Sequence, residues 1–364
     1  MNMVDVLIVG GGIAGASLGA EIAGQRSVLL VEAESHCGFH STGRSAAFWL
    51  ESYGGPVVAS LSAASRPFLD RPPADFSEGG FLRTRGDLHL SRDGELPEIP
   101  PTVETRWVER PELEKLLPGI KAEWRRALFE PGCADIDVAG LHSAYLRQFR
   151  QSGGEVRTDS TLVSAQRSSN GWRARLRDGS EIQAQVIVNA AGAWADAVAI
   201  ACGVEPLGIQ PKRRTMVQLR LGCSGLRDLP LVDDAAGTFY FKGEGNQAIW
   251  LSPHDEIDSD PCDAVPEEID VATAIDRFES VVDWRIEAVE RKWAGLRSFA
   301  PDRIPVYGFD PDQAGFFWFA GQGGFGIQTA PAAAKLSAAL LPGSEPDPMV
   351  AHIEPAPFSP ARFR

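Results

Sequence analysis

Residues 5–23 read DVLIVGGGIAGASLGAEIA, and this stretch decides the fold. The four consecutive apolar residues 6–9 are typical of a parallel strand that is buried on both faces. Gly10, Gly12 and Gly15 follow in G-x-G-x-x-G spacing, and small residues continue at helical spacing. A second apolar run, SVLLVE (27–32), ends in Glu32. A strand, a glycine turn, a helix, a strand and an acidic residue together form a specific dinucleotide-binding fingerprint.

Each position of this fingerprint has a physical reason. Gly10 permits the tight turn, Gly12 lets the backbone approach a pyrophosphate, and Gly15 lets the helix pack closely on the strand. The helix N-terminus offers unpaired N–H groups and a positive dipole end to the phosphates. Glu32 can accept hydrogen bonds from ribose hydroxyls, and its charge disfavours a 2′-phosphate. The flanking strands and Glu32 argue against a merely flexible glycine turn.

The bulk composition excludes several function classes. The net charge of -14 argues against a nucleic-acid partner, because phosphate binding requires clustered Lys and Arg. The five cysteines are scattered without CxxC or Cys/His spacing, which favours free thiols and predicts no metal site. The sequence shows no cleavable leader and no long apolar run, so we expect a cytoplasmic protein without a transmembrane segment. Peripheral membrane contact stays open.

Further motifs carry a family resemblance. They are HSTGRSAA (40–47), AQVIVNAAGAWAD (184–196), QPKRR (210–214), WAGLRSFAPDRIPVYG (293–308) and GFFWFAGQGGFGIQTAPAAAKLSAALL (315–341). In this order they resemble the D-amino-acid oxidase and glycine oxidase superfamily of FAD-dependent amine oxidoreductases. Within it, the sequence is most similar to the bacterial D-arginine dehydrogenases.

The resemblance implies an α/β fold with two interleaved domains. A Rossmann-type FAD-binding domain is expected over residues 1–76, 138–204 and 296–364. An α+β substrate domain with a large mixed β-sheet is expected over residues 77–137 and 205–295. Runs with polar alternation such as TMVQLRL (215–221) fit a sheet that packs on one face.

The implied reaction is oxidation of the Cα–N bond of a D-amino acid to an imino acid, with hydride transfer to FAD. Hydrolysis then gives a 2-oxo acid and ammonia. Two alternatives stay open: oxidation of another carboxylate substrate (an N-substituted glycine, imino acid or 2-hydroxy acid), and a nonenzymatic flavin-binding module. The resemblance also implies a quinone as electron acceptor, with oxygen as the alternative, and a monomer or weak dimer. Because WAGLRSF lacks the cysteine that attaches flavin in sarcosine-oxidase relatives, we expect noncovalent FAD.

Arginines are the expected anchors for the substrate carboxylate, because a guanidinium matches a carboxylate in a two-point fork. The resemblance places Arg214 and Arg297 there, whereas a surface salt bridge is expected for the neighbouring Arg213. The implied catalytic residues are Tyr53, Arg214, Tyr240, Arg297 and Gln328, and the substrate-binding residues add Phe48, Asp87 and Gly324.

Two of these positions depart from the D-arginine dehydrogenases. Asp87 stands where those enzymes have a glutamate that pairs with the substrate guanidinium, and an ordinary strand-end carboxylate is the alternative role. Phe48 stands where they have a histidine, so Phe48 and Trp49 would make the pocket wall more apolar.

The cofactor is expected to contact three regions besides the fingerprint. The segment 40–49 would run along the pyrophosphate towards the flavin, with Arg44 offsetting phosphate charge. The glycine-rich turn near residue 324 would place a helix N-terminus against the flavin ring. The full set of expected cofactor residues is Gly10, Gly12, Ile13, Ala14, Gly15, Glu32, Ala33, Ser41, Thr42, Gly43, Arg44, Ser45, Ala46, Ala47, Phe48, Leu162, Ala191, Gly192, Trp194, Gly323, Gly324, Phe325, Gly326, Ile327 and Gln328.

Overall fold

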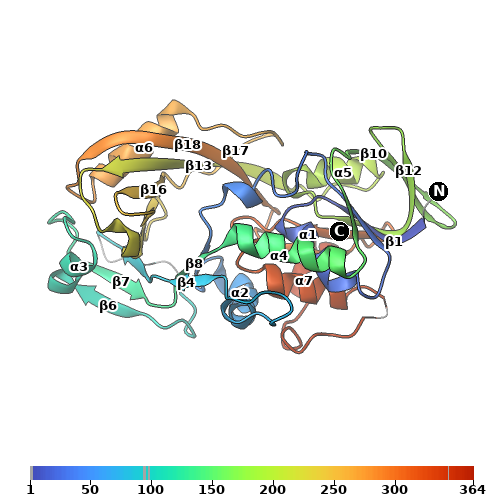
Figure 1. The fold of residues 1–364 in the computed structure, drawn as a ribbon, viewed down its shortest axis with the longest axis horizontal. Helices are drawn as coiled ribbons and strands as arrows, with labels where there is room; N and C mark the ends of the chain where they lie inside the picture. The colour runs from blue at the N-terminus through green and yellow to red at the C-terminus, as the bar shows by residue number, and fades with distance from the viewer. Residues whose placement is uncertain (1–2, 93–95, 97–98, 343) are drawn as a thin grey trace.

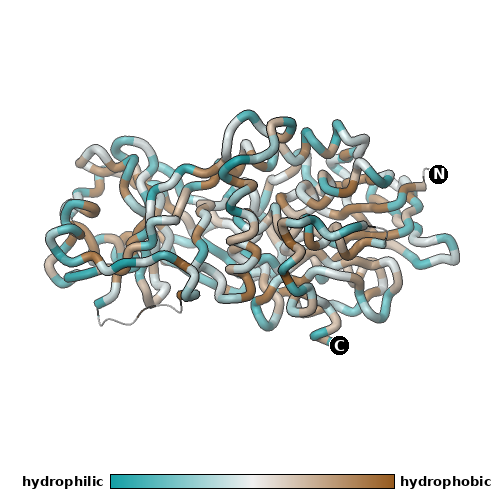
Figure 2. The backbone as a smooth tube through the Cα atoms, turned by 90° about the horizontal axis from the view of Figure 1, so that it is seen from below, coloured by the Kyte–Doolittle hydropathy of each residue, from teal (hydrophilic) through white to brown (hydrophobic). Residues whose placement is uncertain are grey.

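Two large sheets, one at each end of an elongated molecule, dominate the computed structural model (Figure 1). The structure describes residues 3–92, 96, 99–342 and 344–364. Hydrophobic stretches gather inside both ends, and hydrophilic loops surround them (Figure 2). The mixed α/β fold is therefore confirmed.

The first sheet has eight strands in the order β10-β11-β12-β1-β2-β9, with β20 beside β12 and β19 beside β20. Strands β2, β1, β12 and β20 run parallel, so their carboxyl ends meet at one edge of the sheet. The strands are β1 (Met3–Val9), β2 (Val28–Val31), β9 (Glu155–Arg157), β10 (Leu162–Ser168), β11 (Gly171–Leu176), β12 (Glu181–Asn189), β19 (Val306–Phe309) and β20 (Phe316–Ala320).

Alternate residues of β1 pack on opposite faces of this sheet. Val6 and Ile8 join a core with α1, α4 and α7, whereas Leu7 and Val9 join a core with α5 and strands β10 and β11. A Cβ on Gly19 of α1 would lie 3.1 Å from a phenyl ring of α4, so the small residues permit close helix packing. The helices are α1 (Ile13–Ile22), α2 (Gly55–Asp70), α3 (Arg110–Leu116), α4 (Val138–Gln151), α5 (Ala195–Ala201), α6 (Glu268–Glu279) and α7 (Ala330–Ala339).

The second sheet has nine strands in the order β17-β13-β16-β15-β14-β5-β7-β6, with β18 beside β13. The pairing of β14 with β5 is parallel and its other pairings are antiparallel, so this sheet is mixed. The strands are β5 (Asp87–Leu90), β6 (Arg106–Glu109), β7 (Arg126–Glu130), β13 (Gln210–Leu221), β14 (Leu231–Asp234), β15 (Tyr240–Gly243), β16 (Ala248–Ser252), β17 (Ile257–Asp258) and β18 (Ile286–Phe299).

One face of the second sheet is apolar and packs on α3 and α6. Leu88, Val217, Val232 and Phe241 lie on it. Because side chains alternate along a strand, their neighbours Asp87, Met216, Asp233 and Tyr240 point to the opposite face. A small sheet of β3 (Phe48–Trp49), β4 (Leu82–Thr84) and β8 (Ala134–Ile136) is also present. The chain passes between the two large sheets several times, and the exact domain boundaries stay a prediction.

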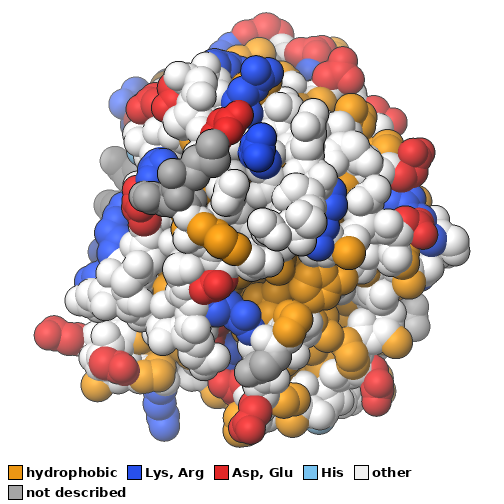
Figure 3. All heavy atoms as spheres, turned by 90° about the vertical axis from the view of Figure 1, so that its right-hand side faces the viewer, with side chains coloured by type: hydrophobic (Ala, Val, Ile, Leu, Met, Phe, Trp, Pro, Cys, Tyr) orange, Lys and Arg blue, Asp and Glu red, His pale blue; other side chains and the backbone are white. Residues whose placement is uncertain are grey.

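The surface gives two further observations. Viewed from the end that carries the first sheet, hydrophobic side chains gather in one area, with charges of both signs scattered around it (Figure 3). Among the described residues, no helix combines the length and the apolar character needed to cross a membrane.

Candidate active site

A cavity of about 530 Å³ extends from the glycine turn after β1 to a pair of arginines on the second sheet. Ligand sites commonly occupy roughly 300–1,000 Å³. Most of the residues expected around the cofactor line it: Gly10, Gly12, Ile13, Ala14, Glu32, Ala33, Ser41, Thr42, Arg44, Ser45, Ala46, Leu162, Ala191, Gly192, Trp194, Gly323, Gly324, Gly326 and Ile327. Arg214, Tyr240 and Arg297 line it as well, so the structure brings the two predicted groups together.

Two glycines of the turn, Gly10 and Gly15, leave no room for a side chain. Gly10 has a φ of +109°, and a Cβ there would lie 2.4 Å from a carbonyl oxygen. A Cβ on Gly15 would lie 1.9 Å from the carbonyl oxygen of Gly10. A Cβ on Gly12, by contrast, would meet only the Thr42 hydroxyl at 3.2 Å, because Gly12 borders the cavity. The backbone therefore lies open to a ligand at the start of α1, where the helix dipole favours phosphate.

The side chains of Glu32 and His142 hold the same turn in place by hydrogen bonds to its backbone. Glu32 accepts hydrogen bonds from the N–H groups of Gly11 at 2.7 Å and Glu34 at 3.0 Å, and it lines the cavity. The Nε2 of His142 in α4 donates to the carbonyl oxygen of Gly11 at 3.0 Å. Burial lowers the pKa of His142, which keeps the ring neutral. His142 was not predicted, because its contact joins residues that are far apart in sequence.

The segment 40–47 lines the cavity and is hydrogen-bonded to β18. Ser41 donates its hydroxyl to the Leu296 carbonyl at 2.6 Å, and Ser45 accepts from the N–H of Ala47 at 3.1 Å. The Arg44 guanidinium donates to two carbonyl groups, one of them in β18, and pairs with Asp263. Its contacts hold the segment against the second sheet. Arg44 also lines the cavity, so its role in offsetting phosphate charge stays a prediction.

Arg297 of β18 lies in the cavity wall beside two tyrosines. Its Nη1 donates to the Tyr53 hydroxyl at 2.8 Å, and its Nη2 makes a longer contact of 3.5 Å with the Tyr240 hydroxyl. The Tyr240 hydroxyl in turn contacts the Met216 sulfur at 3.1 Å. Within the described ranges, Arg297 forms no ion pair with a carboxylate. A guanidinium without a counter-ion in a cavity wall favours an anionic ligand.

Arg214 of β13 is the second guanidinium at this end, and it is only 4% exposed. Its Nε donates to the Asp255 carbonyl at 2.7 Å, and its Nη2 lies 3.2 Å from Glu256. The Nη1 has no hydrogen-bond partner in the described part of the chain. Burial lowers the pKa of Arg214, and the charge of Arg297 lowers it further. The adjacent Arg213 instead forms ordinary ion pairs on the other side of the strand.

His254 lies close to these arginines, and no sequence motif pointed to it. Its ring packs edge-on against Tyr240, and its Nδ1 donates to the Gly237 carbonyl at 2.5 Å. Burial lowers the pKa of His254 to about 4, and the charges of Arg214 and Arg297 contribute. His254 also lines a second cavity, of about 300 Å³, together with Tyr53. Tyr53 therefore lies between the second cavity and Arg297.

Gln328 is a predicted site residue that does not line the main cavity. It is 3% exposed, and its amide bonds both backbone groups of Leu50 and the hydroxyl of Ser62 at 2.8–3.2 Å. These bonds occupy the groups that were expected to reach the flavin and the substrate.

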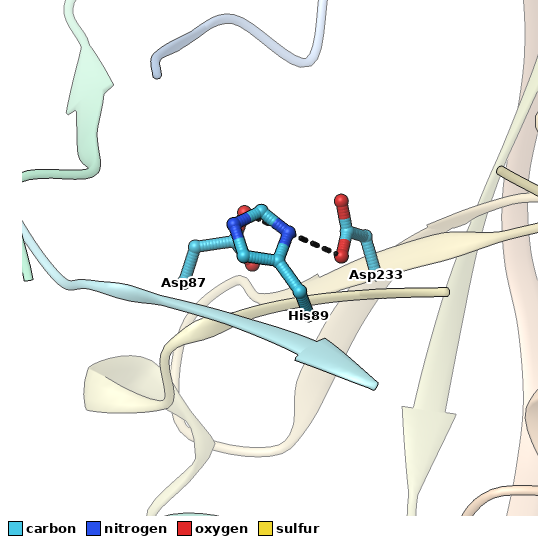
Figure 4. Close-up of side chains that lie close together, drawn as sticks. All are labelled: Asp87, His89 and Asp233. Carbon is cyan, nitrogen blue, oxygen red and sulfur yellow. Dashed lines mark hydrogen bonds and ion pairs between the residues drawn. The ribbon is translucent and has the colours of Figure 1, made fainter. Parts of the chain in front are cut away.

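Phe48 and Asp87 also lie away from the cavity lining. Phe48 packs edge-on behind Tyr240, with ring centroids 5.6 Å apart. Asp87 is fully buried beside His89 and Asp233 (Figure 4), so its carboxylate does not face the cavity as the guanidinium-binding hypothesis required. Four further expected cofactor residues also stand outside the lining: Gly15, Gly43, Ala47 and Phe325. The predicted catalytic residue Tyr53 lines the second cavity instead.

Comparison with known proteins identifies relatives along the whole chain. Residues 5–340 match the family model described as DAO, FAD dependent oxidoreductase. The glycine oxidase of Pseudomonas aeruginosa is 27% identical, over 98% of this chain and 98% of the relative. The L-2-hydroxyglutarate dehydrogenase of Escherichia coli is 26% identical, over 56% of this chain and 51% of the relative. The crystal structure of glycine oxidase from Geobacillus kaustophilus superposes with a TM-score of 0.82 at 20% identity, covering 99% of this chain and 98% of that one.

These findings confirm the superfamily, whereas the narrower resemblance to D-arginine dehydrogenases stays a prediction. The cavity fits FAD, the cofactor of the family. Its evidence is the open backbone at Gly12, where a Cβ would project toward the cavity, together with the fixed carboxylate of Glu32. The five cysteines lie outside the cavity lining, and noncovalent binding of FAD stays a prediction.

Proposed function

Because the chain belongs to the DAO family of FAD-dependent oxidoreductases, we propose that it oxidises the Cα–N bond of a small amino acid. The substrate class is glycine, an N-substituted glycine or a D-amino acid with a short side chain. The observation that carries this proposal is the Arg297 guanidinium, which faces the cavity without a carboxylate partner among the described residues.

Arg297 and Arg214 would bind the substrate carboxylate together. The hydroxyls of Tyr53 and Tyr240 contact separate nitrogens of Arg297 and so fix the orientation of its fork. The unpartnered Nη1 of Arg214 provides a further donor. A carboxylate at this place would neutralise buried positive charge and accept charge-assisted hydrogen bonds, which also fixes the orientation of the α-carbon.

The positive charges of Arg214 and Arg297 favour an amine substrate over an alcohol substrate. Two guanidinium groups disfavour a neighbouring ammonium ion, so they favour the neutral amine whose lone pair assists loss of hydride from the α-carbon. A 2-hydroxy acid would instead need a base for its hydroxyl proton. His254, with a pKa of about 4, is a weak base at neutral pH. FAD, when bound, accepts the hydride.

The residues that line the cavity also indicate the size and charge of the substrate side chain. Glu32 and Glu34 are the acidic residues among the described lining residues, and both lie at the end of the cavity that fits the ribose. The wall near the arginines contains Ala46, Met216 and Tyr240. A short or absent side chain suits this wall better than a guanidinium, since Asp87 is buried elsewhere.

An anaerobic substrate panel tests the proposal. The FAD-loaded protein is mixed with glycine, sarcosine, D-alanine, D-arginine and L-2-hydroxyglutarate, and the flavin absorbance is followed. We expect glycine, sarcosine or D-alanine to bleach the flavin faster than D-arginine. Bleaching by L-2-hydroxyglutarate alone would replace the proposal with alcohol oxidation, and bleaching by no compound would favour a nonenzymatic flavin protein.

A further inference from the structure

Four ionisable side chains meet on the second sheet, outside the cavity lining. Asp87 and His89 come from β5, Glu130 from β7 and Asp233 from β14; we call them the β5 cluster. Asp87 and His89 point to the same face because they are two positions apart on one strand. The strand register places Glu130 opposite Asp87 and Asp233 opposite His89, so all four share that face.

The separations within the β5 cluster are those of a ligand set. The Nδ1 of His89 lies 2.9 Å from Asp233 and 3.7 Å from Asp87, and one atom of each of the three residues lies within 4.8 Å of the others (Figure 4). Ligand atoms placed about 2 Å from a common zinc ion lie roughly 3–4 Å apart. The Nε2 of His89 lies 3.5 Å from Glu130 on its other side.

An independent observation is that several buried carboxylate oxygens of the cluster lack hydrogen-bond partners within the described residues. Asp87 is 0% exposed, and neither of its carboxylate oxygens has a hydrogen-bond partner within the described residues. One oxygen of Glu130 is buried and unpartnered as well. The nearby cations Arg85 and Lys242 pair instead with Asp135. Buried carboxylates are normally paired or bound to a metal.

We propose that Asp87, His89 and Asp233 bind one divalent first-row cation. Two carboxylate oxygens and one imidazole nitrogen suit Zn²⁺ or Mn²⁺. Glu130 lies behind the other ring nitrogen of His89, with 3.5 Å between the two atoms, which is the side on which carboxylates support metal-bound histidines. The ion joins β5 to β14, and Asp233 of β14 pairs with Tyr240 of β15, so it stabilises the strand that carries Tyr240.

Proton sharing is the competing explanation for the same four residues. Burial raises the pKa of Asp87 well above its ordinary value, and Asp233 raises it further. Burial alone would lower the pKa of His89, but the carboxylates of Asp233 and Asp87 raise it well above its usual range. A neutral Asp87 and a charged His89 would then balance the cluster without metal. This explanation predicts no metal uptake.

Metal titration of the FAD-loaded protein separates the two explanations. The protein is purified without an immobilised-metal column, treated with a chelator, dialysed and titrated with ZnCl₂ and with MnCl₂. We expect one bound ion per chain by elemental analysis and a Tm that rises with the concentration of the bound metal. Absence of uptake, together with an unchanged Tm, would overturn the proposal even if no variant folds.

Variants locate the ion. Asp87→Asn and His89→Gln should abolish uptake, and Glu130→Gln should weaken it about 10- to 100-fold. Asp228→Asn is the control, because it alters an exposed carboxylate, with 85% side-chain exposure, at the periphery of the same sheet. This variant should bind the metal as the unchanged protein does. Equal uptake by the unchanged protein and by Asp87→Asn would show that the metal binds elsewhere.

Discussion

Replacing Arg297 with lysine tests the carboxylate anchor. Lysine keeps the positive charge but loses the fork that contacts Tyr53 through one nitrogen and Tyr240 through another. Hydrogen bonds to charged groups contribute about 1.5–3 kcal/mol each. Losing one such bond to the substrate corresponds to roughly a 10- to 100-fold fall in kcat/KM. The glycine turn is untouched, so FAD content should not change.

The assay is anaerobic stopped-flow reduction with the best substrate of the panel, combined with binding of benzoate followed by the flavin spectrum. Benzoate supplies a carboxylate without chemistry, so its Kd isolates the anchor from the reaction. Arg213→Lys is the matched control, because Arg213 is the neighbouring arginine that pairs with Glu267 and Asp270. Arg297 would not be the carboxylate anchor if the kcat/KM and the benzoate Kd of Arg297→Lys stay within twofold of the unchanged protein. The same conclusion would follow if Arg213→Lys changes both quantities as much as Arg297→Lys does.

Three further predictions concern the cofactor, acid stability and Gln328. Gly15→Ala should greatly reduce FAD content, because its Cβ would lie 1.9 Å from a carbonyl oxygen; normal FAD content by absorbance would contradict this. His254 has a folded pKa of about 4 against an ordinary 6.5, so the unfolded chain binds more protons between these values. Unfolding free energy should therefore fall by up to about 3 kcal/mol as pH drops from 6.5 to 4, and His254→Gln should flatten this dependence in urea unfolding; the control His352→Gln, at an exposed position, should leave the dependence unchanged. Gln328→Leu should lower the free energy of unfolding by about 1–3 kcal/mol in the same assay, because it leaves buried groups of Leu50 and Ser62 unpaired. An unchanged free energy of unfolding would contradict this structural role of Gln328.

The fingerprint could be predicted because its information is local. Buried strand, glycine turn and helix follow one another within residues 5–23, and the steric need for Gly10 and Gly15 arises inside that stretch. The pairing of β13 with β18 sets Arg214 beside Gly295, close to Arg297. Only the family resemblance could suggest that proximity, since the two arginines are far apart in the chain.

The departures depend on pairings that sequence patterns do not reveal. Alternation along β5 shows that Asp87 and Leu88 face opposite ways, but the β7 and β14 registers decide that the face carrying Asp87 meets Glu130 and Asp233. Arg44 likewise takes its partners from residues more than 200 positions away. The lowered pKa of His254 depends on burial and on two distant arginines, so its own sequence neighbours carry no sign of it.

Product stoichiometry in an anaerobic single turnover tests the central claim most directly. The FAD-loaded protein is reduced by glycine, sarcosine or D-alanine, and the 2-oxo acid is quantified against the flavin that is bleached. Oxidation of the Cα–N bond predicts one glyoxylate or pyruvate, and one ammonia or methylamine, for each flavin reduced. Flavin that stays oxidised with every amine, yet bleaches with a 2-hydroxy acid, would contradict the account.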